Sequence, residues 1–355
     1  MTASISTLDE SALEAFLGQA VSDAGAALGV LLAHLGDNLG LYRAMADSAP
    51  VTAEDIARRT GTNERLVQEW LANQAAGGYV TYDAGTGRFR LPPEHAFALA
   101  DESSPVLVQG LFHTIAATYQ SIDKEIGAFR TGTGLRWEDH DRELFEATER
   151  SFRPGYRAHL VQEWIPGLPG MHEKLTAGGR VADVGCGYGA STVILAAAYP
   201  NSTFVGYDYH APSIETARKA AEHAGVADRV SFEVADATGI TGPFDLIAFL
   251  DAWHDTSDPV GVARAARQAL ANDGSVLLVE PFAGDRLEDN LTPLGRFAYG
   301  ASTLICVPCS ISDGGPGLGA QAGETRTREM FTKAGFASFR RVGETPLNII
   351  YEARA

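Results

Sequence analysis

A glycine-rich turn near the middle of the chain constrains its fold more than any other stretch. Residues 180–190 read R-V-A-D-V-G-C-G-Y-G-A. The apolar residues before the turn predict a buried strand, and Gly185, Gly187 and Gly189 predict a tight turn into a helix over 190–198. Because glycine has no Cβ, such a turn brings backbone close to a ligand at the carboxyl edge of a parallel sheet. Two ligands use this geometry, a dinucleotide and S-adenosylmethionine.

The residue two positions before the first glycine distinguishes the two ligands. Gly185, Gly187 and Ala190 also satisfy the dinucleotide fingerprint, so the glycines alone leave both open. Asp183 would repel a pyrophosphate, whereas S-adenosylmethionine has no phosphate and carries an ammonium and a sulfonium group. At a separation of about 4 Å and an effective dielectric near 20, the difference is roughly 4 kcal/mol. The sequence therefore predicts a methyl-donor site over 181–189; a nicotinamide site or a turn without a ligand are the alternatives.

Acidic residues end further predicted strands after the turn. Asp208 ends a strand over 203–207, where its carboxylate can accept both ribose hydroxyls, or else cap the next helix. Asp236 follows a strand over 230–234 and is expected to accept the adenine amino group, while the Ala237 N–H bonds a ring nitrogen. A turn-forming aspartate is the alternative at this position. Three acids at three successive strand ends are a more specific signal than any one of them.

Strands and helices alternate through residues 177–355, which predicts an α/β unit with a Rossmann-like sheet and helices on both faces. The last strand is expected to be antiparallel. The expected strands cover 181–184, 203–207, 230–234, 244–250, 275–280, 337–342 and 347–353. A helix is expected over 329–334. The Gly- and Pro-rich segment at about 282–323 is too long for a simple connection, so we expect a lid on the substrate side.

The first 100 residues are predicted to form an all-helical, winged-helix domain. An apolar helical pattern runs over 12–46, and Thr52 and Asp55 have the spacing of a capping box before a helix over 53–60. A helix over 64–75 and a hairpin between 79 and 91 complete the winged helix.

The second helix of this domain lacks the basic face of a DNA-reading helix, because it offers Arg65 against Glu64 and Glu69. We therefore expect the domain to form a homodimer. A ligand-sensing regulator that binds DNA through the wing is the alternative. Residues 101–176 are expected to be helical and to roof the acceptor site with aromatic side chains, Tyr156 among them.

Length and composition bound the class of protein. A chain of 355 residues is longer than one core usually supports, so more than one domain is expected. The formal net charge of −17 argues against nucleic-acid binding. The longest apolar run, near 24–35, is shorter than the roughly 18 residues that span a bilayer, so no membrane partner is expected. Three cysteines make no disulfide framework, and a cytoplasmic location is expected.

A histidine follows the fourth predicted strand in the segment L-D-A-W-H-D-T-S-D-P. His254 is therefore expected at the carboxyl end of the sheet, where a methyl acceptor would lie. Its ordinary pKa of about 6.5 lets an imidazole take a hydroxyl proton near neutrality. Asp255 or another acid could hold its tautomer. A histidine that only caps the next helix is the alternative.

These motifs resemble those of the class I S-adenosylmethionine-dependent methyltransferases. Within them, the chain resembles the small-molecule O-methyltransferases of the caffeate and hydroxyindole type, which have an N-terminal winged-helix dimerisation domain. D-V-G-C-G-Y-G is similar to the donor loop of that family, W-H-D-T-S-D-P to its H-D-W-S-D motif, and V-L-L-V-E-P to the segment of its supporting glutamate. The resemblance implies that His254 is the catalytic base and that Glu280 supports it.

The resemblance also implies the remaining site residues. Cys186, Tyr209, Leu250 and Asp251 are expected to complete the cofactor site, and Trp253 is expected to contact the substrate beside His254. Leu250 stands where the family usually has a basic residue. Glu324 of G-E-T-R-T is shifted from the position of the family's second supporting glutamate, so its role stays open.

Cys306 and Cys309 form a C-x-x-C pair, and we expect no metal there because no second pair or nearby histidine completes a ligand set. The predicted activity is methyl transfer from S-adenosylmethionine, with S-adenosylhomocysteine as product, to a small apolar or aromatic molecule. A hydroxyl group is the expected acceptor; nitrogen and carbon acceptors are alternatives that need no base.

Overall fold

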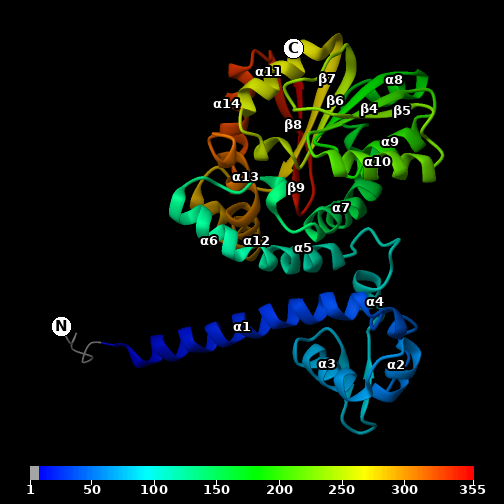
Figure 1. Ribbon diagram of the computed structural model, residues 1–355, viewed down its shortest axis with the longest axis vertical. Helices are drawn as coiled ribbons and strands as arrows, with labels where there is room; N and C mark the ends of the chain where they lie inside the picture. The colour runs from blue at the N-terminus through cyan, green and yellow to red at the C-terminus, as the bar shows by residue number, and fades with distance from the viewer. Residues whose placement is uncertain (1–7) are drawn as a thin grey trace. The chain divides into compact units, whose positions relative to one another are not determined.

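The computed structural model describes residues 8–355, and the chain divides into two compact units between Ala116 and Ala117 (Figure 1). This division falls inside the helical segment that was expected at 101–176.

The N-terminal unit is a winged helix preceded by a long helix. Its elements are α1 (Glu10–Asn38), η2 (Arg43–Met45), α2 (Ala53–Thr60), α3 (Glu64–Ala76), β1 (Thr81–Asp83), β2 (Arg88–Arg90), α4 (Pro93–Leu99) and the first part of α5 (Gln109–Gln120). The predicted capping box is present, since Thr52 Oγ1 accepts from the Asp55 N–H at 3.2 Å and the Asp55 carboxylate accepts from the Thr52 N–H at 3.0 Å. β1 and β2 pair antiparallel as the predicted hairpin. α1 ends earlier than the predicted 46, because Gly40 adopts a left-handed φ of 71°.

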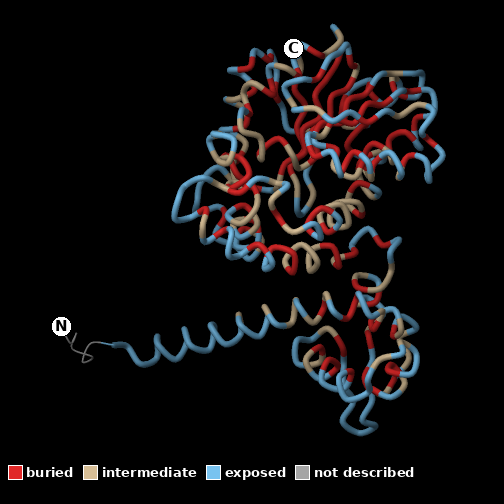
Figure 2. The backbone as a smooth tube through the Cα atoms, viewed as in Figure 1, coloured by how far each residue is buried: buried red, intermediate tan, exposed pale blue. Residues whose placement is uncertain are grey.

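Only the C-terminal end of α1 packs on the winged helix. The Trp70 indole donates a hydrogen bond to the Leu32 carbonyl at 2.8 Å, and Ala33 and Gly36 are buried beside it. The rest of α1 is exposed along its length and extends beyond the other elements of its unit (Figures 1 and 2). Apolar side chains lie on that exposed part: Leu13, Phe16, Leu17, Val21, Leu28, Leu31 and Leu35.

Within residues 8–355, two helices are long and apolar enough to cross a membrane by length and composition. They are Glu10–Asn38 and the continuous helical stretch Pro293–Ser312, with mean hydropathies of 1.5 and 1.2. The first helix contains no uninterrupted apolar run of spanning length, but its mean hydropathy is higher than the apolar run near 24–35 indicates. Part of the second is buried inside its own unit, as is usual for a core helix. The cytoplasmic location therefore stays a prediction.

The C-terminal unit is built on a seven-stranded sheet with the order β5-β4-β3-β6-β7-β9-β8. The five strands from β5 to β7 are parallel, and β9 runs antiparallel to both β7 and β8. All seven predicted strands and the antiparallel last strand are confirmed. The elements of this α/β layer are β3 (Arg180–Val184), α9 (Ala190–Ala198), β4 (Thr203–Asp208), α10 (Ala211–His223), β5 (Val230–Val234), β6 (Phe244–Leu250), η5 (Trp253–Asp255), α11 (Pro259–Ala269), β7 (Leu270–Pro281), α14 (Glu324–Lys333), β8 (Ser338–Glu344) and β9 (Asn348–Arg354).

Each face of the sheet is covered by helices, as predicted (Figure 1). On one face, α9 and α10 pack through Leu195 and Ala217 into a core that also includes helical residues before the sheet. On the other face, α11 and α14 pack through Val262 and Phe331. The strands between them are buried on both sides, which explains their nearly continuous apolar sequences.

Two helical segments flank this layer. The segment before β3 contains α6 (Ile122–Thr131), η3 (Trp137–Asp139), α7 (Glu143–Gly155), η4 (Tyr156–Trp164) and α8 (Met171–Ala177). The insertion after β7 contains η6 (Leu287–Asn290), α12 (Pro293–Ala301), η7 (Ser302–Cys306) and α13 (Val307–Ser312). The insertion is thus largely helical, because Thr292 caps α12 through the Gly295 N–H and Pro293 suits its first turn. α14 begins at Glu324, five residues before the predicted start.

Two glycines of α1 predict opposite effects of the same substitution. A Cβ at Gly36 would lie 2.5 Å from the Trp70 ring, which its bond to Leu32 holds in place. We expect Gly36→Ala to lower the free energy of unfolding by about 1–3 kcal/mol, measured by chemical denaturation of the full chain. Gly18 has no atom within 4 Å of such a Cβ, so Gly18→Ala should be neutral or slightly stabilising. Equal effects of the two variants would contradict this packing.

Candidate active site

A cavity of about 330 Å³ opens at the carboxyl ends of the parallel strands in the C-terminal unit. Nine of the ten predicted cofactor residues line it: Gly185, Cys186, Gly187, Asp208, Tyr209, Asp236, Ala237, Leu250 and Asp251. Aromatic side chains of the preceding helical segment form another part of its wall: Trp137, Phe145, Phe152 and Tyr156. The predicted donor loop and part of the predicted aromatic roof therefore face one cavity.

The glycine turn after β3 is as tight as the sequence predicts. Gly185 has a φ of 75°, and its N–H donates to the Tyr207 carbonyl at 2.8 Å. A Cβ at Gly185 would lie 2.5 Å from the Cβ of Ala252, so only glycine lets the turn pack against the loop after β6. The turns after β3 and β6 are consequently held in direct contact.

Asp208 lies at the end of β4 beside this turn. Its carboxylate accepts hydrogen bonds from the Gly187 N–H at 2.9 Å and from the His210 N–H at 2.8 Å. Burial raises the pKa of Asp208, and these two hydrogen bonds counteract part of that shift. Each carboxylate oxygen can accept more than one bond, so Asp208 can still take the hydroxyls of a ribose.

Asp236 forms a turn and also faces the cavity, so both of its predicted roles, turn formation and adenine binding, are compatible with its position. Its Oδ1 accepts from the Thr238 N–H at 2.8 Å and from the Thr238 hydroxyl at 2.6 Å, as in a turn-forming aspartate. It also lines the cavity together with Ala237.

Asp183 does not line the cavity, which corrects its predicted direct contact with the cofactor. The side chain is buried, and its Oδ2 accepts from the Ser191 and Thr192 hydroxyls at 2.6 Å each. Burial raises its pKa despite these bonds. Asp183 therefore links the end of β3 to the first turn of α9 through these two hydrogen bonds.

His254 and Glu280 are brought together as predicted. His254 Nδ1 lies 2.7 Å from Glu280 Oε2, and both side chains are buried. His254 Nε2 lies 3.2 Å from Asp255 Oδ1. Burial alone would favour the neutral imidazole, but the Asp255 and Glu280 carboxylates outweigh it and hold the pKa of His254 well above its ordinary value.

Asp255, not His254, reaches the cavity wall. Only about 4% of the His254 side chain is exposed, against about 31% of the Asp255 side chain. Asp255 was predicted only as a partner for the histidine, and Cys306, which lies beside both residues, was not predicted to belong to the site. No local signal connects Cys306 with them, because η7 and η5 are far apart in the chain.

Asp251 has a left-handed backbone conformation at the end of β6. It is a non-glycine residue with a φ of 53° directly after β6. Its Oδ1 accepts from the Asn348 amide at 2.6 Å, whereas its Oδ2 has no hydrogen-bond partner within residues 8–355. Burial, together with the charge of Glu280, raises the pKa of Asp251 to about 8. Its place on the cavity wall agrees with the predicted cofactor role.

Three other residues with predicted or open roles are Trp253, Glu324 and Tyr156. Trp253 was expected to contact substrate, but it is fully buried, donates to the Pro259 carbonyl at 3.0 Å and packs on Phe331. It is a core residue. Glu324 pairs with Arg328 one turn along α14 and lies outside the cavity wall, and its role as a second supporting glutamate stays open. The Tyr156 hydroxyl donates to the Leu250 carbonyl at 3.3 Å and remains on the wall.

Known proteins match both units of the chain. Residues 26–101 match the Rv2258c-like winged HTH domain family, and residues 175–334 match a methyltransferase domain family. The chain is 34% identical over 146 residues to 27-O-demethylrifamycin SV methyltransferase of Amycolatopsis mediterranei, which covers 40% of this chain and 48% of that protein. The chain spans between about a quarter and a half of the length of the curated relatives it matches.

Solved structures match over nearly the whole chain. A putative O-methyltransferase from Nostoc punctiforme has a TM-score of 0.74 at 18% identity, covering 96% of this chain and 98% of that one. Human N-acetylserotonin methyltransferase in complex with S-adenosylmethionine has a TM-score of 0.67 at 17% identity, covering 98% and 99%. At these identities the likeness shows the fold.

These matches identify the class: an S-adenosylmethionine-dependent methyltransferase domain preceded by a winged-helix domain. The predicted fold, class and cofactor are confirmed. Within the class, the chain combines an Rv2258c-like winged HTH domain with this methyltransferase domain.

Asp208 provides a direct test of the cofactor site. Asp208→Asn keeps the size of the side chain and removes the charge that the ribose hydroxyls would meet, so we expect S-adenosylhomocysteine to bind about tenfold to hundredfold more weakly in calorimetry. Asp228→Asn is the matched control, because the Asp228 side chain is about 75% exposed and lies outside the cavity wall. An unchanged affinity of Asp208→Asn would exclude the proposed ribose contact.

Proposed function

We propose that the protein transfers a methyl group from S-adenosylmethionine to a hydroxyl group of a small, largely apolar or aromatic molecule. The single observation that carries this proposal is the cavity that the donor loop shares with the aromatic wall, next to the buried pair of His254 and Glu280. The name of the relative 27-O-demethylrifamycin SV methyltransferase also refers to an oxygen atom as the site of methylation.

The donor would be held by acids and backbone, since Asp208 is placed for the ribose and Asp236 with Ala237 for the adenine. Gly185 and Gly187 allow the close approach of the amino-acid part. When bound, S-adenosylmethionine supplies a methyl group on a positively charged sulfur. The protein's main task is then to hold the acceptor oxygen in line with that methyl group.

The charge of the cavity wall limits the class of molecule that can serve as the methyl acceptor. Among the described residues, the wall carries seven acidic side chains and no Lys, Arg or His: Glu149, Asp208, Asp236, Asp251, Asp255, Asp258 and Asp313. Such a wall favours a cationic donor and disfavours an anionic acceptor or a pyrophosphate. We therefore propose an acceptor without carboxylate or phosphate groups, which also argues against the nicotinamide alternative.

His254 is proposed as the group that receives the acceptor proton, supported on Nδ1 by Glu280. Because Asp255 stands between the cavity and Nε2, its carboxylate must move aside for an acceptor hydroxyl to reach the imidazole. That movement also removes a negative charge from the imidazole, so its pKa falls towards the range in which it can act as a base. Nitrogen and carbon acceptors remain alternatives because they need no such base.

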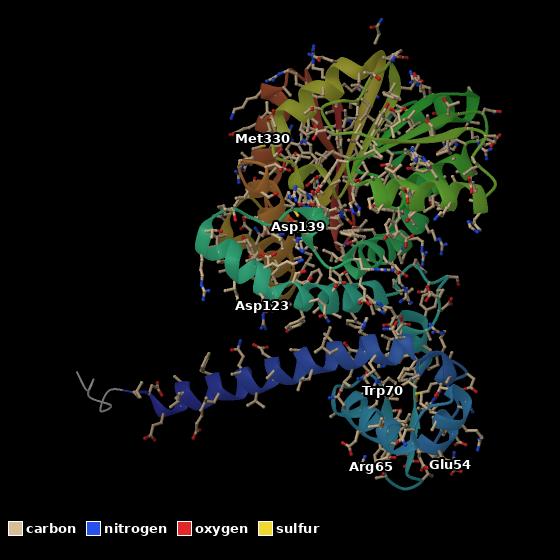
Figure 3. All side chains as sticks on the ribbon, viewed as in Figure 1. Glu54, Arg65, Trp70, Asp123, Asp139 and Met330 are labelled. Atoms are coloured by element: carbon tan, nitrogen blue, oxygen red, sulfur yellow. The ribbon has the colours of Figure 1, made fainter. Side chains whose placement is uncertain are left out.

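The DNA-binding alternative lacks support from the winged helix. On α3, Arg65 pairs with Glu69 at 2.5 Å, and the exposed side chain of Arg65 is labelled in Figure 3. A helix whose basic residue is neutralised by its own carboxylate makes a poor contact with phosphates.

The pH dependence of methyl transfer tests the role of His254. The assay follows transfer from labelled S-adenosylmethionine to a panel of neutral hydroxylated aromatics. We expect the rate to rise with pH as His254 loses its proton, and His254→Ala to lower turnover by roughly 10²–10⁴-fold. Asp255→Asn removes one charge that raises the pKa of His254, so the rising limb should move to lower pH by about one unit or more.

Asp273→Asn is the control for the pH shift, because this exposed aspartate pairs with Lys174 away from the cavity wall. A pH profile that Asp255→Asn leaves unchanged, or full turnover by His254→Ala, would contradict the proposed base. Full turnover would instead mean that placement of the acceptor alone suffices, or that the methyl group goes to carbon or nitrogen.

We further propose that α1 forms a homodimer. Its apolar side chains are solvent-exposed in the single chain, with Phe16 about 64% and Val21 about 74% exposed. Pairing with the same helix of a second copy would remove this apolar surface from water.

Charge substitutions on α1 test the dimer by light scattering. Phe16→Asp combined with Val21→Asp should convert a dimer into a monomer, because each places a charge inside the apolar contact. Gln19→Asp adds a charge at an exposed polar position of the same helix and serves as the control. A monomeric natural protein that floats with phosphatidylcholine vesicles would contradict the dimer and assign α1 to a membrane surface.

A further inference from the structure

Three potential metal ligands from two segments that are distant in the sequence lie together at the cavity wall and directly behind it. They are His254 and Asp255 of η5 and Cys306 at the end of η7. We propose that these three side chains form a binding site for a soft divalent transition metal of the Zn²⁺ type. No histidine lies close to the C-x-x-C pair in the sequence, but the fold brings His254 beside Cys306 and His140 beside Cys309.

The spacing of the ligand atoms fits a small tetrahedral ion. One ligand atom from each residue lies within 4.8 Å of the other two, and His254 Nε2 is 3.2 Å from Asp255 Oδ1. With metal–ligand distances of about 2.0–2.3 Å, the ligand atoms of a tetrahedral zinc site are about 3–4 Å apart. Small side-chain adjustments therefore bring all three donors into range.

The surroundings of the histidine are those of a metal ligand. Glu280 Oε2 is 2.7 Å from Nδ1, so it orients the ring and leaves Nε2 directed at Asp255 and Cys306. A carboxylate on the second ring nitrogen is the usual arrangement around metal-bound histidines, where it fixes the tautomer and increases ligand basicity.

The cavity supplies a route and a fourth ligand. Asp255 lines the cavity while His254 and Cys306 lie buried behind it, so an ion entering from the cavity meets the carboxylate first. Water from the cavity can occupy the open fourth position. A nitrogen, a thiolate sulfur and a single carboxylate oxygen together favour zinc-like ions over Mg²⁺ or Ca²⁺, which prefer oxygen ligands.

Binding is a proton exchange and involves no redox step. The metal forms bonds to the His254 nitrogen, the Cys306 sulfur and the Asp255 oxygen. The imidazolium proton and the thiol proton pass to solvent, and no electrons are transferred. Without a metal, burial raises the pKa of the Cys306 thiol to about 12, which makes it unreactive as a redox thiol. Cys309 faces His140 instead, with Sγ 3.8 Å from Nε2.

A metal at this site would block the proposed base. Nε2 of His254 cannot bind a metal and accept the acceptor proton at the same time. This consequence rests on the proposed function, and it predicts that micromolar Zn²⁺ lowers methyl transfer to a hydroxyl acceptor. The site itself does not depend on that activity.

Cobalt substitution tests the site on the full-length protein. We expect Co²⁺ to give a sulfur-to-cobalt charge-transfer band in the near ultraviolet, and Zn²⁺ to abolish it by displacement. Cys306→Ser should lose the band, whereas Cys309→Ser should keep it and serves as the matched control. Asp255→Asn should weaken Co²⁺ binding about tenfold or more. Circular dichroism melting curves check that each variant is folded.

The outcomes separate the two proposals. The metal site is excluded if the natural protein shows no band, or if Cys306→Ser retains it. If Cys306→Ser does not fold, an unchanged Co²⁺ affinity of Asp255→Asn overturns the site. If the band appears and Zn²⁺ leaves methyl transfer unaffected, the metal site stands and the role of His254 as base falls. If turnover depends on His254 and no band forms, the metal site is excluded and the proposed role of His254 as base is retained.

Discussion

The contact between the turns after β3 and β6 determines the rest of the site. Gly185 packs so closely on Ala252 that a single added carbon would lie 2.5 Å from its Cβ. The first turn approaches the donor through backbone, and the second carries Asp251, His254 and Asp255 within a few residues of Ala252. Because the two turns pack on each other this closely, the loop that would hold the donor and the loop that carries the buried imidazole are positioned together. The proposed in-line placement of an acceptor depends on that arrangement.

The charge state of His254 follows from a competition that can be estimated. Burying an ionisable group can shift its pKa by up to 3–5 units, which is about 4–7 kcal/mol against the charged form. At roughly 3 Å and an effective dielectric near 20, each neighbouring carboxylate contributes about 5 kcal/mol in its favour. With Glu280 on one ring nitrogen and Asp255 near the other, the attraction exceeds the cost of burial. One carboxylate alone would leave the two effects nearly balanced, so Asp255 controls the protonation of the imidazole.

Sequence patterns predicted the strands and the cofactor loop, because these depend on local periodicity and on which strand ends are acidic. The pairing of His254 with Glu280 was implied by the family resemblance instead. Sequence patterns gave wrong predictions where contacts with distant segments determine the position of a side chain. Asp183 is buried under the turn by two hydroxyls of α9, and Trp253 turns into the core because Phe331 of α14 packs on it. The Gly- and Pro-rich insertion was expected to form a lid and no helix was assigned within it, whereas Pro293 and the Thr292 cap begin a helix. Cys306 reaches His254 only through the tertiary packing of that insertion.

The acidic wall and the buried base have to be considered together. A phenolate-type acceptor, already ionised in solution, would not need a base, and placement alone would then suffice for methyl transfer. The cavity wall carries carboxylates and, among the described residues, no Lys or Arg to balance them, so it disfavours an ionised acceptor. Under the proposed function, an acceptor hydroxyl therefore enters neutral and has to lose its proton inside the site. The proposed role of the histidine–glutamate pair is to receive that proton, and Asp255, which faces the cavity, is then the residue that an incoming hydroxyl would displace.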